Sequence, residues 1–227
     1  MLLSFSNVSF SYNKNFKVLK NISFNIEKGE KIALLGLNGA GKSTLILHTN
    51  GLLLPNEGQV LVNGLNTRGN SLKEIRKKIG IVFQNPDDQL FMPTVFEDVA
   101  FGPRNMNIGE SEVEQRVKNA LEATNTLHLK DKSPYELSGG QKKSVCIATV
   151  LSMSPELLVM DEPTSGLDYK ASDNFISIVE NLEQALLLST HDLDLARKLC
   201  RRALVLKDGT LVFDGKISEL KNPYSLF

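Results

Sequence analysis

The sequence predicts an α/β protein built on a mixed, mainly parallel sheet, with a β-rich N-terminal part and a helical segment inserted in the core. Three observations predict this class. Apolar and polar residues alternate near the N-terminus, apolar residues recur at helical spacing in the middle, and short apolar runs alternate with helical patterns in the last third. Strands separated by helices are typical of a parallel sheet. With 227 residues, of which 41% are hydrophobic, the chain can bury a core.

The N-terminal part contains most of the early strands. We expect strands at residues 2–12 and 18–26, joined by a polar turn at 13–15, then at 31–35, 58–62 and 79–83. The last of these runs ends before Asn85 and Pro86, which favour a turn.

The pattern changes to helical spacing from residue 96 to about 151, as in Val113, Val117, Ala120 and Leu121. After Pro155 the expected elements are a strand at 157–160, a helix at 171–182, a strand at 185–189, a helix at 193–200, and strands at 203–206 and 210–213. Because no repeat or linker separates these parts, we expect one domain over residues 1–227, with about 84–151 as a helical subdomain inserted in its core.

The composition excludes several classes of protein. Lys plus Arg and Asp plus Glu are both 26, so no net charge draws the chain to nucleic acid, and we expect no nucleic-acid partner. The apolar runs are far shorter than the ~20 residues of a spanning helix, and the N-terminus has no signal-peptide pattern, so we expect a cytoplasmic protein. Cys146 and Cys200 lack metal or redox spacing and are expected to be buried packing residues.

A phosphate-binding loop follows the strand at 31–35. It consists of Gly36, Leu37, Asn38, Gly39, Ala40, Gly41, Lys42 and Ser43, and the helical run that begins at Thr44 comes next. The glycines let backbone N–H groups turn inward around phosphate oxygens. Lys42 places its charge on the β and γ phosphates, Ser43 offers a hydroxyl to Mg²⁺, and the helix N-terminus adds its dipole. The sequence therefore predicts a nucleotide site.

Two adjacent acids, Asp161 and Glu162, end the apolar strand at 157–160. The carboxyl ends of parallel strands face the ligand crevice, so Asp161 can approach Mg²⁺ and Glu162 can orient and partly deprotonate the attacking water. A solvated strand end is the alternative interpretation.

The segment Leu137-Ser138-Gly139-Gly140-Gln141 resembles the signature sequence of ABC ATPases, and the other motifs stand in that family's order over nearly the whole chain. The resemblance implies the ABC ATPase fold, in which a P-loop NTPase core carries an N-terminal antiparallel β subdomain and an inserted α-helical subdomain. It also implies ATP hydrolysis coupled to transport, with ATP and Mg²⁺ as cofactors.

The resemblance further implies roles for single residues. Tyr12 matches the aromatic that stacks on adenine, although core packing would also explain it and Phe16 is a rival. Gln84 matches the glutamine that touches Mg²⁺ and water, His191 the histidine at the γ-phosphate, and Asp168 the acid that links two active sites across a dimer. His48 and His128 are expected to be surface or packing residues.

The signature also predicts a second phosphate site, because a Ser-Gly-Gly turn at a helix start presents unpaired N–H groups. Ser138, Gly139, Gly140 and Gln141 of one chain would face the phosphate loop of a second ATPase subunit, either an identical chain or a close paralogue. Ser144 departs from the family, whose members usually carry a basic residue there, so contacts near the signature helix are in doubt.

The segment at 83–102 is similar to the energy-coupling-factor importers for cobalt, nickel or vitamins. This implies two membrane partners, a coupling subunit and a substrate-binding subunit, and no direct contact with the transported substrate. Asp87 and Asp88 would meet a basic helix of the coupling subunit, although a solvated turn is the alternative. Because we find no dimerising C-terminal region, dimerisation would depend on ATP and the membrane subunit. The alternative interpretations are another ABC importer or exporter, a soluble ABC protein, and a P-loop kinase or G protein.

Overall fold

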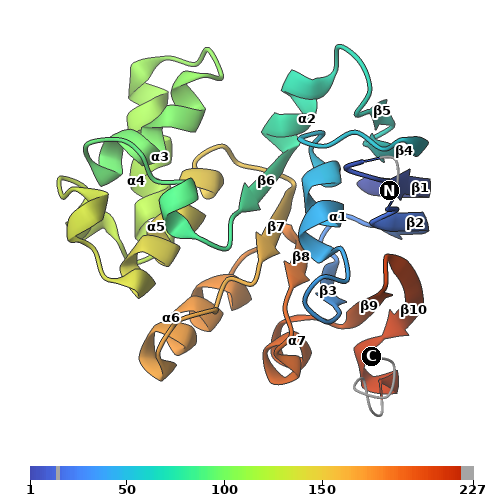
Figure 1. Cartoon of the computed structure of the whole chain (residues 1–227). Coiled ribbons are helices and arrows are strands. Elements are labelled where there is room, and N and C mark those ends of the chain that lie inside the picture. The colour runs from blue at the N-terminus through green and yellow to red at the C-terminus, as the bar shows by residue number, and fades with distance from the viewer. Residues whose placement is uncertain (14–15, 221–227) are drawn as a thin grey trace. The chain divides into compact units, whose positions relative to one another are not determined.

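The structure is a computed structural model that describes residues 1–13 and 16–220. The chain folds into two compact units, whose elements are labelled in Figure 1. Among the described residues, the first unit holds those within 1–79, 156–161 and 183–220, and the second holds Gly80–Pro155 and Glu162–Leu182.

The first unit begins with an antiparallel sheet in the order β2-β1-β4-β5. Its strands are β1 (Leu3–Phe10), β2 (Leu19–Ile26), β4 (Glu57–Val62) and β5 (Leu65–Asn66). From Ile22 to Ile26, alternate side chains of β2 are buried, which matches the alternation of apolar and polar residues there. Asn13 and Phe16 form an isolated bridge, and the rest of the turn predicted at 13–15 lies outside the described residues.

The second sheet of this unit has the strand order β10-β9-β3-β8-β7. Its strands are β3 (Lys31–Leu35), β7 (Leu157–Asp161), β8 (Ala185–Ser189), β9 (Arg202–Lys207) and β10 (Thr210–Lys216). All neighbours pair in parallel except β9 and β10, so the predicted mixed, mainly parallel sheet is confirmed. Strands β3, β7 and β8 are continuous apolar runs because a parallel sheet is buried on both faces.

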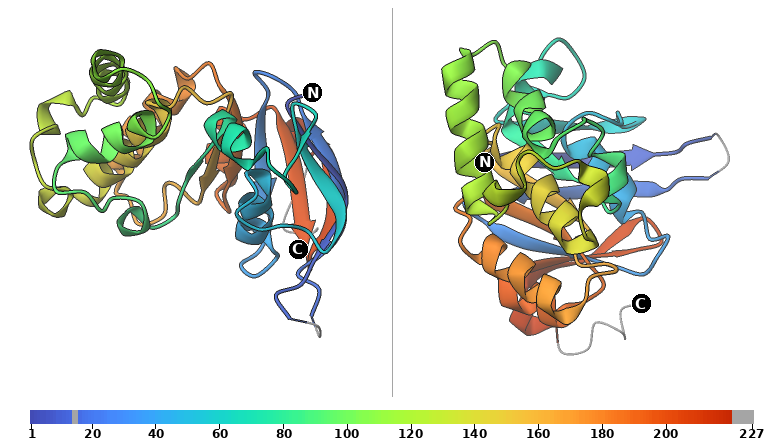
Figure 2. Two further views of the ribbon diagram at one scale, coloured as in Figure 1. Left: turned by 90° about the horizontal axis from the view of Figure 1, so that it is seen from above. Right: turned by 90° about the vertical axis from the view of Figure 1, so that its left-hand side faces the viewer.

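Helices α1 (Lys42–Thr49), α2 (Leu72–Lys78) and α7 (Leu193–Leu199) complete the first unit. Helix α1 contacts β4 of the antiparallel sheet and β7 of the parallel sheet, so it lies between the two (Figure 2). The phosphate loop leads directly into this helix. Strand β6 (Ile79–Val82) carries the chain from the first unit into the second.

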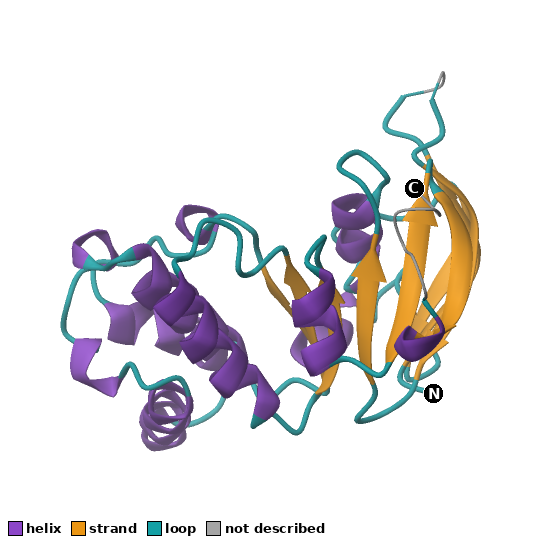
Figure 3. Ribbon diagram, turned by 90° about the horizontal axis from the view of Figure 1, so that it is seen from below, coloured by secondary structure: helices purple, strands orange, loops and turns teal. Residues whose placement is uncertain are grey.

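The second unit is mostly helical (Figure 3), as the apolar spacing predicts. Its helices are α3 (Val95–Arg104), α4 (Glu110–Ala123), α5 (Gly139–Leu151) and α6 (Tyr169–Glu180). Helix α5 contacts the other three, and Ser152, just after it, donates a 2.8 Å hydrogen bond from Oγ to the carbonyl of Val99 on α3. The helix that carries the signature is thus the central helix of its unit.

The sequence pattern did not predict two elements of the structure. Helix α2 has one buried residue, Ile75, in seven, and β5 is two residues long, so neither carries a readable period. The helical pattern at 96–151 is divided into separate helices, with Asn107 and Asn125 in the left-handed conformation between them. Within the described residues, no helix is both long and apolar enough to cross a bilayer.

Candidate functional site

Six residues of the phosphate loop, 36–41, lie between β3 and α1, and its last two, Lys42 and Ser43, begin α1. Gly41 is the N-cap of α1 with φ 105°, and a Cβ there would lie 3.1 Å from the carbonyl oxygen of Val18. Gly39 also has positive φ, 83°. Their N–H groups have no hydrogen-bond partner in the described part of the chain. The loop therefore holds free donors at the N-terminus of a helix, which is the arrangement that binds phosphate.

Lys42 places its charge inside this loop. The residue is 7% exposed, and Nζ donates hydrogen bonds to the carbonyl oxygens of Gly36 at 2.7 Å and Leu37 at 3.3 Å. Ser43, the next residue, is exposed in the first turn of α1. The ammonium is thus held against the loop by backbone carbonyl groups, which limits the ordering needed to place its charge on an anion.

Asp161 lies at the same edge of the parallel sheet. It pairs with Ser189 on β8, and Ser189 pairs on its other side with Leu34 of β3, directly before the loop. The residue is 8% exposed, and its Oδ1 finds no hydrogen-bond partner among the described residues. Because an unsatisfied buried acceptor costs about 1–3 kcal/mol, this oxygen is expected to bind a ligand.

His191 follows β8 at that edge. The backbone N–H of Thr190 bonds to the carbonyl of Leu34 at 3.2 Å, and the N–H of Asp192 donates to Thr190 Oγ1 at 3.0 Å. Asp192 then caps α7 by accepting from the N–H of Asp194 and Leu195. These bonds hold the exposed His191 in a tight turn at the edge of the sheet where β3 leads into the phosphate loop.

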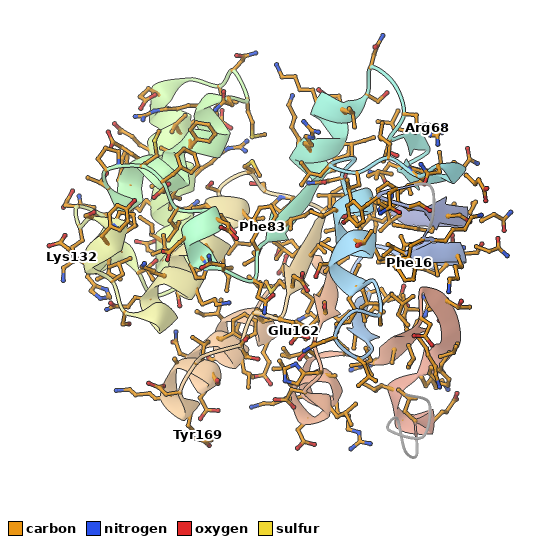
Figure 4. The ribbon with its side chains drawn as sticks, viewed as in Figure 1. Phe16, Arg68, Phe83, Lys132, Glu162 and Tyr169 are labelled. Atoms are coloured by element: carbon orange, nitrogen blue, oxygen red, sulfur yellow. The ribbon has the colours of Figure 1, made fainter. Side chains whose placement is uncertain are left out.

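Tyr12 is 62% exposed, which excludes the core-packing interpretation. Its hydroxyl lies 3.1 Å from Oγ1 of Thr44 on α1, and its ring packs edge-on against Phe10 with centroids 4.9 Å apart. Phe16, labelled in Figure 4, is also exposed, at 66%. Both aromatic residues are therefore free to stack on a planar ligand.

The remaining predicted residues belong to the second unit. Glu162 directly follows Asp161, is 8% exposed, and has a φ of 43°, a left-handed conformation that is rare for glutamate. Such backbone strain gathers at functional sites. Gln84 is exposed, two residues after the end of β6. It directly follows Phe83 in the sequence, and Figure 4 labels Phe83.

The signature forms the N-terminus of α5. Ser138 Oγ accepts from the N–H of Gln141 at 3.4 Å, while Gln141 Oε1 accepts from the N–H of Ser138 at 3.0 Å. This reciprocal capping leaves the N–H groups of Gly139 and Gly140 with no partner within the described residues. The expected pair of free donors is therefore present.

Asp168 is the N-cap of α6, where Oδ1 accepts from the N–H of Ala171 at 2.8 Å. Tyr169, the first residue of α6, points into solvent (Figure 4) and is 83% exposed. Asp168 thus has a capping role besides any contact with another chain.

Ser144 is buried in α5, 4% exposed, and its Oγ accepts a 3.4 Å hydrogen bond from Nδ2 of Asn174 on α6. The small hydroxyl joins two helices here. Lys143 is equally buried, and its Nζ donates to the backbone carbonyl of Gln84. The sequence reasoning did not find this link. The spacing of three residues between Lys143, Cys146 and Thr149 could have predicted it, because this spacing places the three side chains near one face of the helix.

The residues expected to pack do so. His48 is fully buried, its Nδ1 lies 2.7 Å from the carbonyl oxygen of Thr44, and burial lowers its pKa. His128 is on the surface. Cys146 and Cys200 are buried, and desolvation raises the pKa of each thiol to about 12, which keeps them unreactive.

Comparison with known proteins agrees with this geometry. The family model described as ABC transporter matches residues 19–165. A putative ABC transporter ATP-binding protein of Geobacter sulfurreducens is 48% identical over 92% of this chain and 84% of its own length. The energy-coupling factor transporter ATP-binding protein EcfA of Methanocaldococcus jannaschii is 47% identical over 93% of this chain and 77% of its own length.

Solved structures match as well. The structure of cbiO1 from Clostridium perfringens, described as part of the ABC transporter complex cbiONQ, has 40% sequence identity and a TM-score of 0.87 over 96% of this chain and 90% of its own. A dimeric structure of the ATP-binding cassette MJ0796 bound to ADP and Pi has 29% identity and a TM-score of 0.83 over 95% of this chain and 99% of its own. The chain therefore belongs to the ATP-binding proteins of the ABC transporter family, of the energy-coupling factor type, and is an ATPase.

Proposed function

We propose that this chain is the nucleotide-binding subunit of an importer at the inner face of the cytoplasmic membrane, and that residues 1–227 act as one ABC ATPase domain with a helical subdomain at about 84–151. The observation that carries the hydrolytic part of the proposal is the buried Asp161. Its Oδ1 lacks a partner among the described residues and lies at the sheet edge that also bears the phosphate loop.

Mg²⁺ fits the donors at this edge. The Ser43 hydroxyl and the Asp161 carboxylate offer the oxygen ligands that this cation prefers, and a Mg²⁺ site of this kind is completed by substrate phosphates. Gln84 is the third proposed ligand. When bound, Mg²⁺ neutralises negative charge on the β and γ phosphates.

The chain's own residues would then bind ATP and position water. Tyr12 would stack on the adenine, and residues 36–44 would hold the phosphates through N–H groups and the Lys42 ammonium. Glu162 would orient the attacking water and take its proton, while His191 would contact the γ-phosphate. Glu162 and His191 are the proposed catalytic side chains, with Gln84 beside the metal.

We further infer that two ATPase subunits face each other. The free N–H groups of Gly139 and Gly140, together with Ser138 and Gln141, form a second phosphate-seeking site that one chain alone leaves unused. In a dimer, this site would close over the nucleotide held by the phosphate loop of the partner subunit, with Asp168 linking the two sites. The dimeric relative supports this arrangement.

The membrane partners would be a coupling subunit and a substrate-binding subunit, and the cargo cobalt, nickel or a vitamin. The complex to which cbiO1 belongs supports a multi-subunit assembly. Asp88 is exposed and available to a basic helix of the coupling subunit, whereas Asp87 already lies 2.6 Å from Lys142 Nζ. Asp88 is therefore the stronger candidate for that contact.

The test is transport by the assembled complex. The chain would be co-expressed with the membrane proteins encoded beside it, reconstituted in vesicles, and assayed for ATP-dependent uptake of radiolabelled Co²⁺, Ni²⁺ or a vitamin. Uptake that is lost with Glu162→Gln is the expected result. Hydrolysis without uptake of any of these substrates would favour another ABC importer or an exporter, and failure to associate with membrane proteins would favour a soluble ABC ATPase.

A further inference from the structure

The segment that carries Gln84 is tied by side chains to the helix that carries the signature. Gln89 makes the central contacts. Its Oε1 accepts a hydrogen bond from the N–H of Phe83 at 3.1 Å, and its Nε2 donates to the carbonyl of Cys146 and to Oγ1 of Thr149, both at 2.8 Å. One half-buried side chain therefore joins the residue before Gln84 to the middle of α5.

Other side chains of α5 reach the same segment. Lys143 Nζ donates to the carbonyl of Gln84 itself. Lys142 Nζ lies 2.6 Å from Asp87 Oδ1, and Cys146 Sγ lies 3.9 Å from the carbonyl oxygen of Pro86. The backbone from residue 83 to 87 is thus held at both ends and in the middle by one face of α5.

These contacts fix a segment that has little structure of its own. Between β6 and α3 the only regular element in the described chain is the single turn η1 (Pro86–Asp88). Such a turn is too short to hold its own position, because few backbone bonds stabilise it. Helix α5, in contrast, is capped at Ser138 and fully buried along Val145 to Ala148. The position of Gln84 is therefore set by α5.

We propose that Gln89 is a positioning residue for ATP hydrolysis, which acts with Lys143 to hold Gln84 in register with the signature helix. The inference rests on the proposed role of Gln84 at the hydrolysis site. A glutamine is needed at position 89 because the site presents a donor on one side, the Phe83 N–H, and acceptors on the other, so only a side chain with both functions satisfies it.

The decisive experiment is a double-mutant cycle on steady-state ATP hydrolysis by the full chain, with Gln89→Leu, Gln84→Ala and the double variant. We expect Gln89→Leu to lower kcat by roughly 10-fold to 10²-fold through misplacement of Gln84, with KM for Mg-ATP changed less than about twofold. In the Gln84→Ala background, the same substitution should lower kcat by less than about twofold, because the residue that it positions is already gone.

Two further variants separate positioning from general stability. Gln89→Glu keeps the shape and the acceptor for the Phe83 N–H, but it replaces the donor to α5 with a carboxylate that faces the carbonyl oxygen of Cys146. Its kcat should therefore fall at least as far as that of Gln89→Leu. Gln115→Leu is the matched control, since Gln115 lies exposed on α4 and bonds only to Asn119 at 2.7 Å among the described contacts. It should keep the wild-type kcat.

The outcomes distinguish the inference from its premise. If Gln84→Ala keeps the wild-type kcat, the proposed role of Gln84 fails and the positioning role falls with it. If Gln84→Ala lowers kcat while Gln89→Leu does not, or if the two losses multiply, only the positioning role is overturned. A loss of thermal stability in Gln89→Leu at unchanged kcat per folded molecule would assign Gln89 to fold maintenance alone.

Discussion

The two glycines of the signature differ sharply in their surroundings, and this difference predicts different effects of the same substitution. A Cβ on Gly140 would lie 2.8 Å from the Cβ of Ala171, in the first turn of α6, whereas a Cβ on Gly139 would meet nothing within 4 Å. The new methyl group at position 140 and the methyl group of Ala171 are both Cβ atoms, whose positions are fixed by the backbone, so neither can move away by rotation. Gly140→Ala must therefore shift α5 or the first turn of α6, which Asp168 caps.

The magnitude follows from comparing the two alanine variants. Both gain a similar amount of helix propensity, so that contribution cancels in the difference. The remaining overpacking costs about 1–3 kcal/mol at Gly140. At about 2–4 °C per kcal/mol for a chain of this size, Gly140→Ala should melt about 2–12 °C below Gly139→Ala.

The assay is thermal unfolding by circular dichroism of both variants and of Gly140→Ala combined with Ala171→Gly. Removal of the Ala171 methyl group should restore most of the loss, apart from the propensity cost of the new glycine. Equal melting temperatures for the two single variants, or no recovery in the double variant, would refute the steric reasoning.

Four other predictions follow from the same structure. Glu162→Gln should keep ATP binding and lower the rate of phosphate release by roughly 10²–10⁴, because it removes the proposed base. Lys42→Ala should weaken ATP binding in titration calorimetry, since it removes the ammonium from the loop. The chain should be largely monomeric without nucleotide, and Mg-ATP should drive Glu162→Gln to a dimer in light scattering, because ATP supplies the anion that both half-sites need. Lys78 and Lys28 lower the pKa of Glu156 to about 2 from 4.5, so the stability from this carboxylate is present above pH 4.5 and is lost as the pH falls through 2. The melting temperature of Glu156→Gln should therefore lie below that of wild type at pH 7, with a difference that shrinks below pH 4.5.

Each of these four predictions would be contradicted by a specific result. Phosphate release within threefold of wild type would remove Glu162 from catalysis, and unchanged nucleotide affinity would do the same for the binding role of Lys42. A stable dimer without nucleotide, or dimerisation driven equally by ADP, would place the control of assembly outside the two phosphate sites. A melting difference for Glu156→Gln that persists unchanged below pH 4.5 would show that its ion pairs contribute nothing.

Much of the fold was predictable because its strands carry local signals. The alternation in β2 and the apolar runs of β3, β7 and β8 follow directly from which faces of each sheet are buried. The exposed, short α2 was not predictable, because a helix with one buried residue leaves no apolar period to read. The core-packing interpretation of Tyr12 is wrong, because the residue is exposed and the sequence does not show which aromatic side chains remain outside the core.

The sequence by itself determined the phosphate loop, the paired acids after β7 and the signature cap, because each depends on backbone geometry or capping within a few neighbouring residues. Only the tertiary structure decided which residues hold these motifs in place. Gln89 reaches Cys146, and Gly140 leaves room for Ala171, through contacts between segments far apart in the chain. Such contacts depend on how the helices pack. Packing pairs hydrogen-bond donors with acceptors and fills space between residues that are far apart in the sequence, so the local sequence pattern does not show it.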